Sequence, residues 1–240
     1  MNTHDRHHYL LRGFSMLFQP GLKRFVFTPI LINIIVYTLL IATAYHFIKD
    51  FSLWMSHLLP HWLSWISWLI WPLFLVANLI FIIYTFTLFA NIISAPFNSF
   101  LSEKVETLIT TKKISNSTWQ DSLKTAPRAL LREWEKIKYY LPRAIILLVL
   151  GFFPIINIFS NLLWFVFGSW MMAIQYLDYP MDNHKISFTD MIQKLRISYL
   201  SNFAFGASVM VLSFIPILNL FVIPAAVIGA TLKFLEGRNL

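Results

Sequence analysis

The sequence contains no cysteine among its 240 residues, and only 12% of its residues are charged. The lack of cysteine excludes disulfide bonds and thiolate metal sites. The low charge excludes an ordinary soluble domain, in which roughly a quarter of the residues are charged. Hydrophobic residues make up 58% of the chain and aromatic residues 17%. The composition therefore predicts a protein whose solvent is a lipid bilayer, with aromatic side chains at the membrane surface.

Motifs that carry catalysis are also missing. The patterns HExxH, GxSxG, GxGxxG and the P-loop do not occur in the sequence, so we expect no enzyme activity and no cofactor. The formal net charge is +8, which in a soluble protein would suggest nucleic-acid binding. Most of this charge lies between apolar runs. We therefore expect it in cytoplasmic loops that face anionic lipid, and we expect no nucleic-acid partner.

Two of four uncharged regions predict long membrane-spanning helices. Residues 25–48 are long enough to cross a hydrocarbon core of about 30 Å at a rise of about 1.5 Å per residue. Residues 62–97 exceed the length of one span. Trp62, Trp65 and Trp68 recur there at helical spacing, where an interfacial aromatic belt would lie.

A charged segment over residues 103–143 follows these two spans. Its excess of Lys and Arg places it in the cytoplasm under the positive-inside rule. Residues 123–140 have an amphipathic pattern. We expect a helix there that is broken at Pro127 and ends before Pro142.

The other two uncharged regions, residues 144–177 and 202–232, are too long for one span and too short for two. Each is flanked by cations on both sides, which indicates that both of its ends lie on the same side of the membrane. We therefore expect two re-entrant, partly penetrating helical hairpins. The predicted fold class is an all-α integral membrane protein. Residues 1–240 would form a single membrane domain of two long transmembrane helices, the two hairpins and cytoplasmic amphipathic helices.

The two predicted hairpins share a short repeat. The segment FFPIINIF at residues 152–159 aligns with FIPILNLF at residues 214–221, including the Pro and Asn of each. Repeats in membrane proteins often place a transport path at the repeat interface, around broken helices. The alternative interpretation is that Pro-x-x-Asn is turn chemistry used twice.

A candidate anion site lies at Gly21, Leu22, Lys23 and Arg24. A helix that begins near Leu22 leaves its first backbone N–H groups without intrahelical partners, at the positive end of the helix dipole. A tetrahedral dianion could bind these groups together with the two cationic side chains, and Gly21 permits close backbone approach. The alternative is that the two cations anchor a helix end at the lipid surface.

Other polar residues have two interpretations each. Three arginines could form an inner vestibule for anions, or they could be lipid anchors or partners of Glu133 and Glu135. Four asparagines in apolar runs could line a path, or join helices by hydrogen bonds. Asp178, Asp182 and His184 resemble a metal site, but a structural turn is favoured and no metal is expected. The arginines are Arg128, Arg132 and Arg143, and the asparagines are Asn33, Asn78, Asn91 and Asn98.

Several stretches resemble one family along nearly the whole chain, from Gly13 to Leu235. They are QPGLKRF, ISAPFN, REWEK followed by YYLPRAI, and AIQYLDYPMDNHK. The sequence resembles the CysZ sulfate permeases of Gram-negative bacteria. This resemblance implies a multi-pass inner-membrane protein that admits sulfate for cysteine biosynthesis and assembles as a homo-oligomer. It also implies that Gly21–Arg24 is the sulfate-binding motif. Lys23 stands where Arg is usual, so the charge is kept and the planar bidentate fork is lost.

The uncharged regions contain no carboxylate that could couple transport to protons. The membrane potential opposes entry of an anion by about 2.3 kcal/mol per charge per 100 mV, so consumption of sulfate inside must sustain the flow. We therefore expect a channel-like or facilitated pathway for sulfate, with sulfite as a second candidate. The alternatives are a proton-coupled symporter and a non-conducting scaffold or sulfate sensor.

Overall fold

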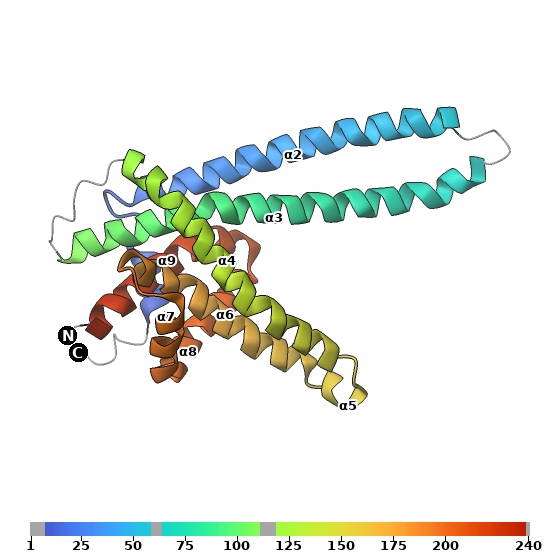
Figure 1. Ribbon diagram of the computed structural model, residues 1–240. Helices are drawn as coiled ribbons and strands as arrows, with labels where there is room; N and C mark the ends of the chain where they lie inside the picture. The colour runs from blue at the N-terminus through green and yellow to red at the C-terminus, as the bar shows by residue number, and fades with distance from the viewer. Residues whose placement is uncertain (1–7, 59–63, 111–118, 239–240) are drawn as a thin grey trace. The chain divides into compact units, whose positions relative to one another are not determined.

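The computed structural model describes residues 8–58, 64–110 and 119–238 (Figure 1). Within these ranges all regular secondary structure is helical, which confirms the predicted all-α class. The chain divides into two compact units. The first consists of Met1–Phe27 and Ala95–Leu240, and the second of Thr28–Ser94.

The second unit is formed by parts of two long helices, α2 (Lys23–Leu58) and α3 (Ser64–Thr110). α2 has 36 residues, so its length of about 54 Å exceeds the hydrocarbon core of a bilayer. Aromatic rings join the two helices near their connection. The Phe51 and Phe74 rings stack with centroids 3.7 Å apart, and Trp71 contacts both rings edge-on.

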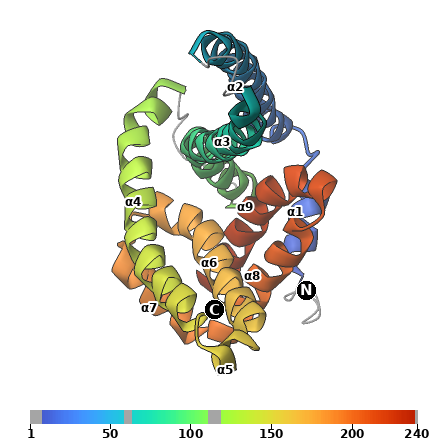
Figure 2. The same cartoon turned by 90° about the vertical axis from the view of Figure 1, so that its right-hand side faces the viewer.

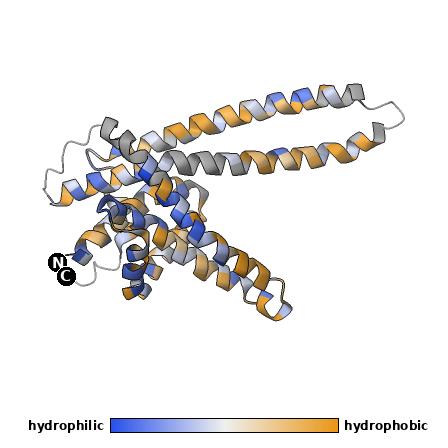
Figure 3. Ribbon diagram, in the orientation of Figure 1, coloured by the Kyte–Doolittle hydropathy of each residue, from blue (hydrophilic) through white to orange (hydrophobic). Residues whose placement is uncertain are grey.

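Two helical stretches of the described residues are long and apolar enough to cross a membrane, Ile34–Phe51 in α2 and Leu218–Arg238 in α9. The first is 6% buried within the protein and the second 67%. In α3, Trp68–Ile82 is a shorter apolar stretch. Figure 3 shows the apolar colouring along much of α2 and of the described part of α3.

The first unit contains a helical hairpin made by α4 (Trp119–Leu150), the short α5 (Pro154–Asn157) and α6 (Ser160–Asn183). The chain turns at Gly151–Phe153, and α5 begins at a proline, whose missing N–H costs nothing in the first helical turn. The Tyr140 and Phe167 rings stack between the two arms, with centroids 5.3 Å apart. Figure 3 shows that the turning end of this hairpin is apolar.

A second hairpin follows, made by α8 (Tyr199–Ser213) and α9 (Pro216–Arg238). α9 also begins at a proline, so both segments of the FFPIINIF repeat mark a turn between helices. α7 (Phe188–Ile197) precedes this hairpin and meets α8 at an angle of 102°. The Ser187 side chain caps α7 by accepting a hydrogen bond from the Asp190 N–H group at 3.1 Å.

One sequence-based expectation about α4 is wrong. The helix runs through Pro127 and Pro142, although we expected a break at the first and an end before the second. A proline removes one backbone donor and clashes with the preceding turn, but packing against a neighbouring helix can hold the helix together. Here the ion pairs of Arg132 and the stacked Tyr140 ring, both between the two prolines, hold α4 against α6.

Helix α1 (Tyr9–Met16) packs against α9 in the core of the first unit (Figure 2). A Cβ atom added at Gly13 would overlap the Ala225 carbonyl oxygen, and one at Gly206 of α8 would overlap the Ser169 carbonyl oxygen of α6. Glycine therefore sets the close approach of both helix pairs, as small residues do in membrane proteins. A salt bridge of 2.6 Å between Arg12 and Glu236 closes the α1–α9 contact.

Candidate functional site

The predicted anion site lies at the turn that joins α1 to α2. Gly21 has a φ of +93°, a left-handed conformation that glycine adopts without steric cost. Leu22 is fully buried, and its N–H group donates to the Gln19 carbonyl oxygen at 3.1 Å. The Leu22 carbonyl then accepts hydrogen bonds from Phe25 and Val26. Leu22 thus anchors the turn, and α2 begins at Lys23, one residue later than expected.

The first two residues of α2 present unsatisfied donors to solvent. In the part of the chain that the structure describes, the N–H groups of Lys23 and Arg24 have no backbone acceptor. Both side chains are exposed. The Arg24 guanidinium lies 4.9 Å from the centroid of the Phe25 ring, which leaves its polar edge available. This arrangement combines backbone donors, the helix dipole and two cations, which together favour an anion.

A third cation lies beside this turn and was not predicted. The Lys104 Cε atom is 3.9 Å from the position that a Cβ atom would occupy on Gly21. Lys104 belongs to α3 and is half-buried. Within the described ranges, no carboxylate forms a salt bridge with Lys23, Arg24 or Lys104. Lys104 could not be predicted as a neighbour, because it is far from Gly21 in the sequence and only the fold brings the two residues together.

The predicted arginines fall into a separate set of contacts between α4 and α6. Arg132 is buried, and its Nε atom lies 2.7 Å from Asp178 Oδ1. A weaker pair of 3.4 Å joins Arg132 to Glu135. Of the alternatives considered for Arg132, pairing with an acidic residue is the one observed. Its main partner is Asp178 and not the predicted Glu133.

Lys136 completes this buried network. Its Nζ atom lies 3.0 Å from Asp178 Oδ2 and 2.8 Å from Glu133 Oε1. Burial alone lowers the pKa of Lys136, but the negative charges of Asp178 and Glu133 outweigh it, and the pKa is raised above its ordinary value. Lys136 therefore stays protonated and holds α4 against α6.

Arg128 and Arg143 also have local partners. Arg128 Nη2 donates to the Asp182 carbonyl oxygen at 2.6 Å and to its carboxylate at 3.0 Å. Arg143 donates to the Tyr139 carbonyl oxygen at 2.6 Å and lies over the Tyr139 ring at 3.7 Å. Its side chain is exposed. Neither residue joins the turn at Gly21, and a vestibule role for them stays a prediction.

The asparagines differ in what the structure describes. Asn98 is buried in α3, and its amide donates to the Tyr179 hydroxyl at 3.2 Å, which joins α3 to α6. For Asn98, the contact agrees with the alternative that these asparagines join helices by hydrogen bonds. Asn78 is half-buried in α3. Asn33 lies in α2 and Asn91 in α3, but their side chains lie outside what the structure describes, and their role on a path stays a prediction.

The residues of the DYPMDNHK segment have separate partners. Asp178 binds Arg132 and Lys136, and Asp182 binds Arg128. The His184 ring nitrogen Nε2 lies 2.9 Å from the Glu106 carboxylate of α3. The three side chains thus hold α6 to its neighbours. The expected turn is wrong for Asp178 and Asp182, because α6 continues through Pro180 to Asn183.

Comparison with known proteins covers nearly the whole chain. Residues 9–224 match the family described as Sulfate transporter CysZ/Etoposide-induced protein 2.4. A protein of Pseudomonas fluorescens strain Pf0-1 named Sulfate transporter CysZ is 44% identical over 235 residues, covering 96% of this chain and 93% of that protein. Proteins of the same name from Pseudomonas aeruginosa PAO1 and P. fluorescens SBW25 are 44% and 46% identical, over 94% and 91% of their lengths and 96% of this chain. With its apolar helices, the chain is a membrane protein of the Sulfate transporter CysZ/Etoposide-induced protein 2.4 family.

Proposed function

We propose that this protein carries sulfate across the bacterial inner membrane into the cell and so supplies cysteine biosynthesis. The observation that carries the proposal is the full-length similarity to proteins named sulfate transporters, at 44–46% identity over 96% of the chain. The chain would be multi-pass, surrounded by lipid, and assembled as a homo-oligomer. Sulfite is a second candidate oxyanion. Transport chemistry of this kind requires no catalytic group.

The first contact of sulfate with the protein would be the cationic turn, defined as Gly21–Arg24 together with Lys104. A sulfate dianion has four oxygen atoms that accept hydrogen bonds. The N–H groups of Lys23 and Arg24 and three cationic side chains would supply donors. Hydrogen bonds to charged groups contribute about 1.5–3 kcal/mol each, more than those between neutral groups. Because both side chains of α2 are exposed, the anion would keep part of its hydration and could leave again.

The pathway itself would be channel-like or facilitated. The apolar runs offer no carboxylate for a proton relay, so the flow would follow sulfate consumption inside the cell. Lys23, Arg24 and Lys104 would concentrate the dianion at the mouth of this pathway by their combined field. The rival function is a membrane scaffold or sensor that binds sulfate without conducting it.

Uptake of radiolabelled sulfate into proteoliposomes tests the proposal. We expect wild-type protein to conduct sulfate without an imposed pH gradient. Arg24→Gln and Lys104→Gln should each lower uptake roughly tenfold, since each removes a charge-assisted hydrogen bond. Lys49→Gln, at an exposed cation near the other end of α2, is the matched control and should conduct as the wild type does.

Three results would contradict this proposal in different ways. Uptake that requires a pH gradient would indicate a proton-coupled symporter. Sulfate binding without uptake would indicate a sensor or scaffold. Unchanged uptake in Arg24→Gln would show that the cationic turn is not part of the pathway. It would not contradict sulfate transport itself.

A further inference from the structure

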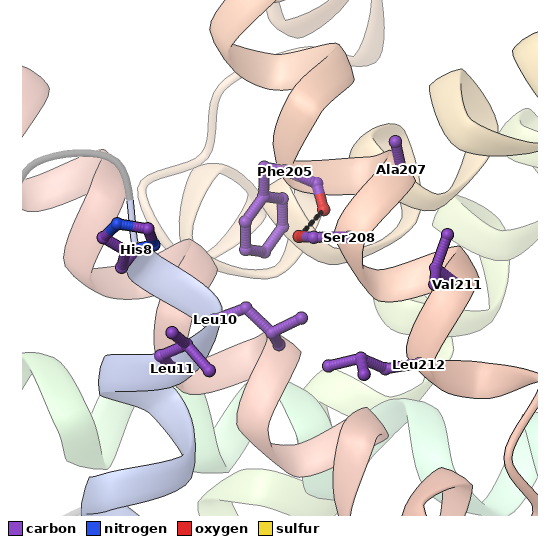
Figure 4. Close-up of a pocket in the computed structure, with 8 residues that line it drawn as sticks. All are labelled: His8, Leu10, Leu11, Phe205, Ala207, Ser208, Val211 and Leu212. Carbon is purple, nitrogen blue, oxygen red and sulfur yellow. Dashed lines mark hydrogen bonds between the residues drawn. The ribbon is translucent and has the colours of Figure 1, made fainter.

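An apolar groove of about 430 Å³ lies in the first unit, between the start of α1 and the side of α8 (Figure 4). This volume lies within the range of about 300–1,000 Å³ that is usual for small-molecule sites. Figure 4 shows His8 beside Phe205 at one end and Val211 with Leu212 toward the other. The side chains that line it include His8, Leu10, Leu11, Phe205, Val211 and Leu212.

The lining offers almost no polar partner. The Ser208 hydroxyl, which also faces the groove, donates to the Phe205 carbonyl oxygen at 2.7 Å and is therefore satisfied within α8. Leu11 is 58% exposed and Val211 is 51% exposed. An extended peptide in this groove would leave its backbone N–H and C=O groups without partners. A hydrocarbon chain has no such groups, so the lining suits a chain of methylene groups.

A cation lies near the Phe205 end of the groove, behind the side chains that line it. The Lys233 Nζ atom is 5.9 Å from the centroid of the Phe205 ring and 5.5 Å from that of Tyr9, the residue between His8 and Leu10. Nζ donates to the Ser201 carbonyl oxygen and to the Ser201 hydroxyl, both at 2.7 Å. An ammonium group has three donors, so one stays available to a ligand at this end.

The two ends of the groove differ in polarity, and they lie at different heights along the second hairpin. Lys233 and Ser201 lie at the base, where α8 begins and α9 nears its end, and Leu212 lies next to the turn at Phe214. The cationic end is therefore at the base and the apolar end at the turn. A phospholipid in a bilayer leaflet has the same polarity along its length, with its phosphate at the interface and its acyl chains toward the middle.

We propose that this groove binds one anionic phospholipid, with an acyl chain along α8 and the headgroup phosphate at Lys233 and His8. The inference concerns a site apart from the cationic turn and does not depend on which anion the protein transports. Phosphatidylglycerol is the probe that represents this chemistry.

The experiment uses full-length protein in detergent micelles with phosphatidylglycerol that carries a photoreactive diazirine on its acyl chain. Labelled residues are mapped by mass spectrometry. Exposed apolar residues of α2, such as Leu31 and Leu39, report non-specific labelling by surrounding lipid. Ala207→Phe fills the groove, and Ala204→Phe places the same ring on an exposed position of α8 outside it.

We expect labels on α8 and on Leu10–Leu11 in excess of those on α2. Ala207→Phe should reduce the groove labels roughly tenfold, a loss of about 1.4 kcal/mol in binding, while α2 labels and the Ala204→Phe control stay unchanged. Phosphatidylglycerol should compete better than phosphatidylcholine, and Lys233→Gln should abolish that preference, which tests the headgroup contact even if Ala207→Phe fails to fold.

The proposal is overturned if the groove labels follow the α2 labels in every variant, because labelling would then come from surrounding lipid only. Equal competition by phosphatidylglycerol and phosphatidylcholine in the wild type would overturn the headgroup assignment. Cross-links between two protein copies at α8 in the absence of lipid would show that a second copy occupies the groove instead.

Discussion

At the scale of single residues, Asp178 holds together the buried network between α4 and α6. It is 1% exposed, and its two carboxylate oxygen atoms pair with Arg132 and Lys136. Removal of one partner from a buried ion pair leaves an uncompensated charge. This costs far more than the pair itself contributes relative to an apolar replacement.

Asp178→Asn should therefore lower the free energy of unfolding by about 3–5 kcal/mol, because it leaves two buried cations facing a neutral amide. Urea unfolding in detergent micelles, followed by circular dichroism, measures the change. Asp50→Asn, at an exposed position of α2, is the control and should stay within about 0.5 kcal/mol of the wild type. Equal stability of the two variants would show that Asp178 contributes little to the free energy of unfolding.

Stability should also depend on alkaline pH through the same network. The pKa of Lys136 is raised above its ordinary value of 10.5, and burial raises the pKa of Tyr179 above 10.0. Both shifts favour the protonated form in the fold. Their contribution is fully present below the ordinary values and is lost as the pH rises through the folded ones. We expect the free energy of unfolding to fall above pH 10.0, where the first of the two groups begins to titrate in the unfolded chain, with a shallower fall in Lys136→Met.

Lys23 lies at the first position of α2 with an exposed side chain. Lys23→Arg should tighten sulfate binding roughly tenfold, because the guanidinium fork can make a second charge-assisted bond. Equilibrium binding of radiolabelled sulfate to purified protein measures the effect, with Lys49→Arg as the control. Weaker binding in Lys23→Arg would mean that the anion does not sit at this helix start in the way described.

The side-chain partners of the site residues could not be predicted from the sequence. The local features of the turn, a glycine that permits close approach and two cations at a helix start, follow from the residues themselves and could be predicted. The burial of Leu22 was not predicted. Lys104 beside Gly21 and Asp178 between Arg132 and Lys136 depend on how distant segments pack. The residue pattern within a segment does not indicate which distant segment packs against it.

At the scale of helices, the contact between α6 and α8 depends on Gly206. Gly206→Ala should lower the free energy of unfolding by about 1–3 kcal/mol, because the added methyl group overlaps the Ser169 carbonyl oxygen and forces the helices apart. Thermal unfolding in detergent provides the measurement. The control is Gly237→Ala near the end of α9, where an added Cβ meets no atom within 4 Å.

The prolines at the two hairpin turns were interpreted correctly from the sequence, and those inside α4 were not. Pro154 and Pro216 follow apolar runs and mark the two turns, as expected. Pro127 and Pro142 lie inside α4, which continues through both. The difference lies in the surroundings: α4 is held by ion pairs and ring contacts to α6, and this tertiary packing offsets the lost backbone hydrogen bonds.

At the scale of the whole molecule, the lack of cysteine gives a direct test of topology. Single cysteines at Gln193, on the exposed face of α7, and at Asn157, at the turn of the first hairpin, can be labelled without background. In oriented vesicles we expect Gln193→Cys to react with an impermeant maleimide only from the cytoplasmic side, and Asn157→Cys from neither side. Labelling of Asn157→Cys from outside would show that the hairpin crosses the membrane completely.

The charged residues of the first hairpin limit how deeply it can enter the membrane. Lys136 and Asp178 lie on opposite arms, and each would cost several kcal/mol at the centre of a bilayer. Arg143 is exposed and lies nearer the turn, so it would also cost several kcal/mol there. From Arg143 to the turn at Gly151, α4 rises about 12 Å, less than the hydrocarbon thickness of about 30 Å. With Arg143 kept at the water interface, we expect the turn to stop short of the far leaflet surface, so that the charged residues of α4 set the depth of the hairpin.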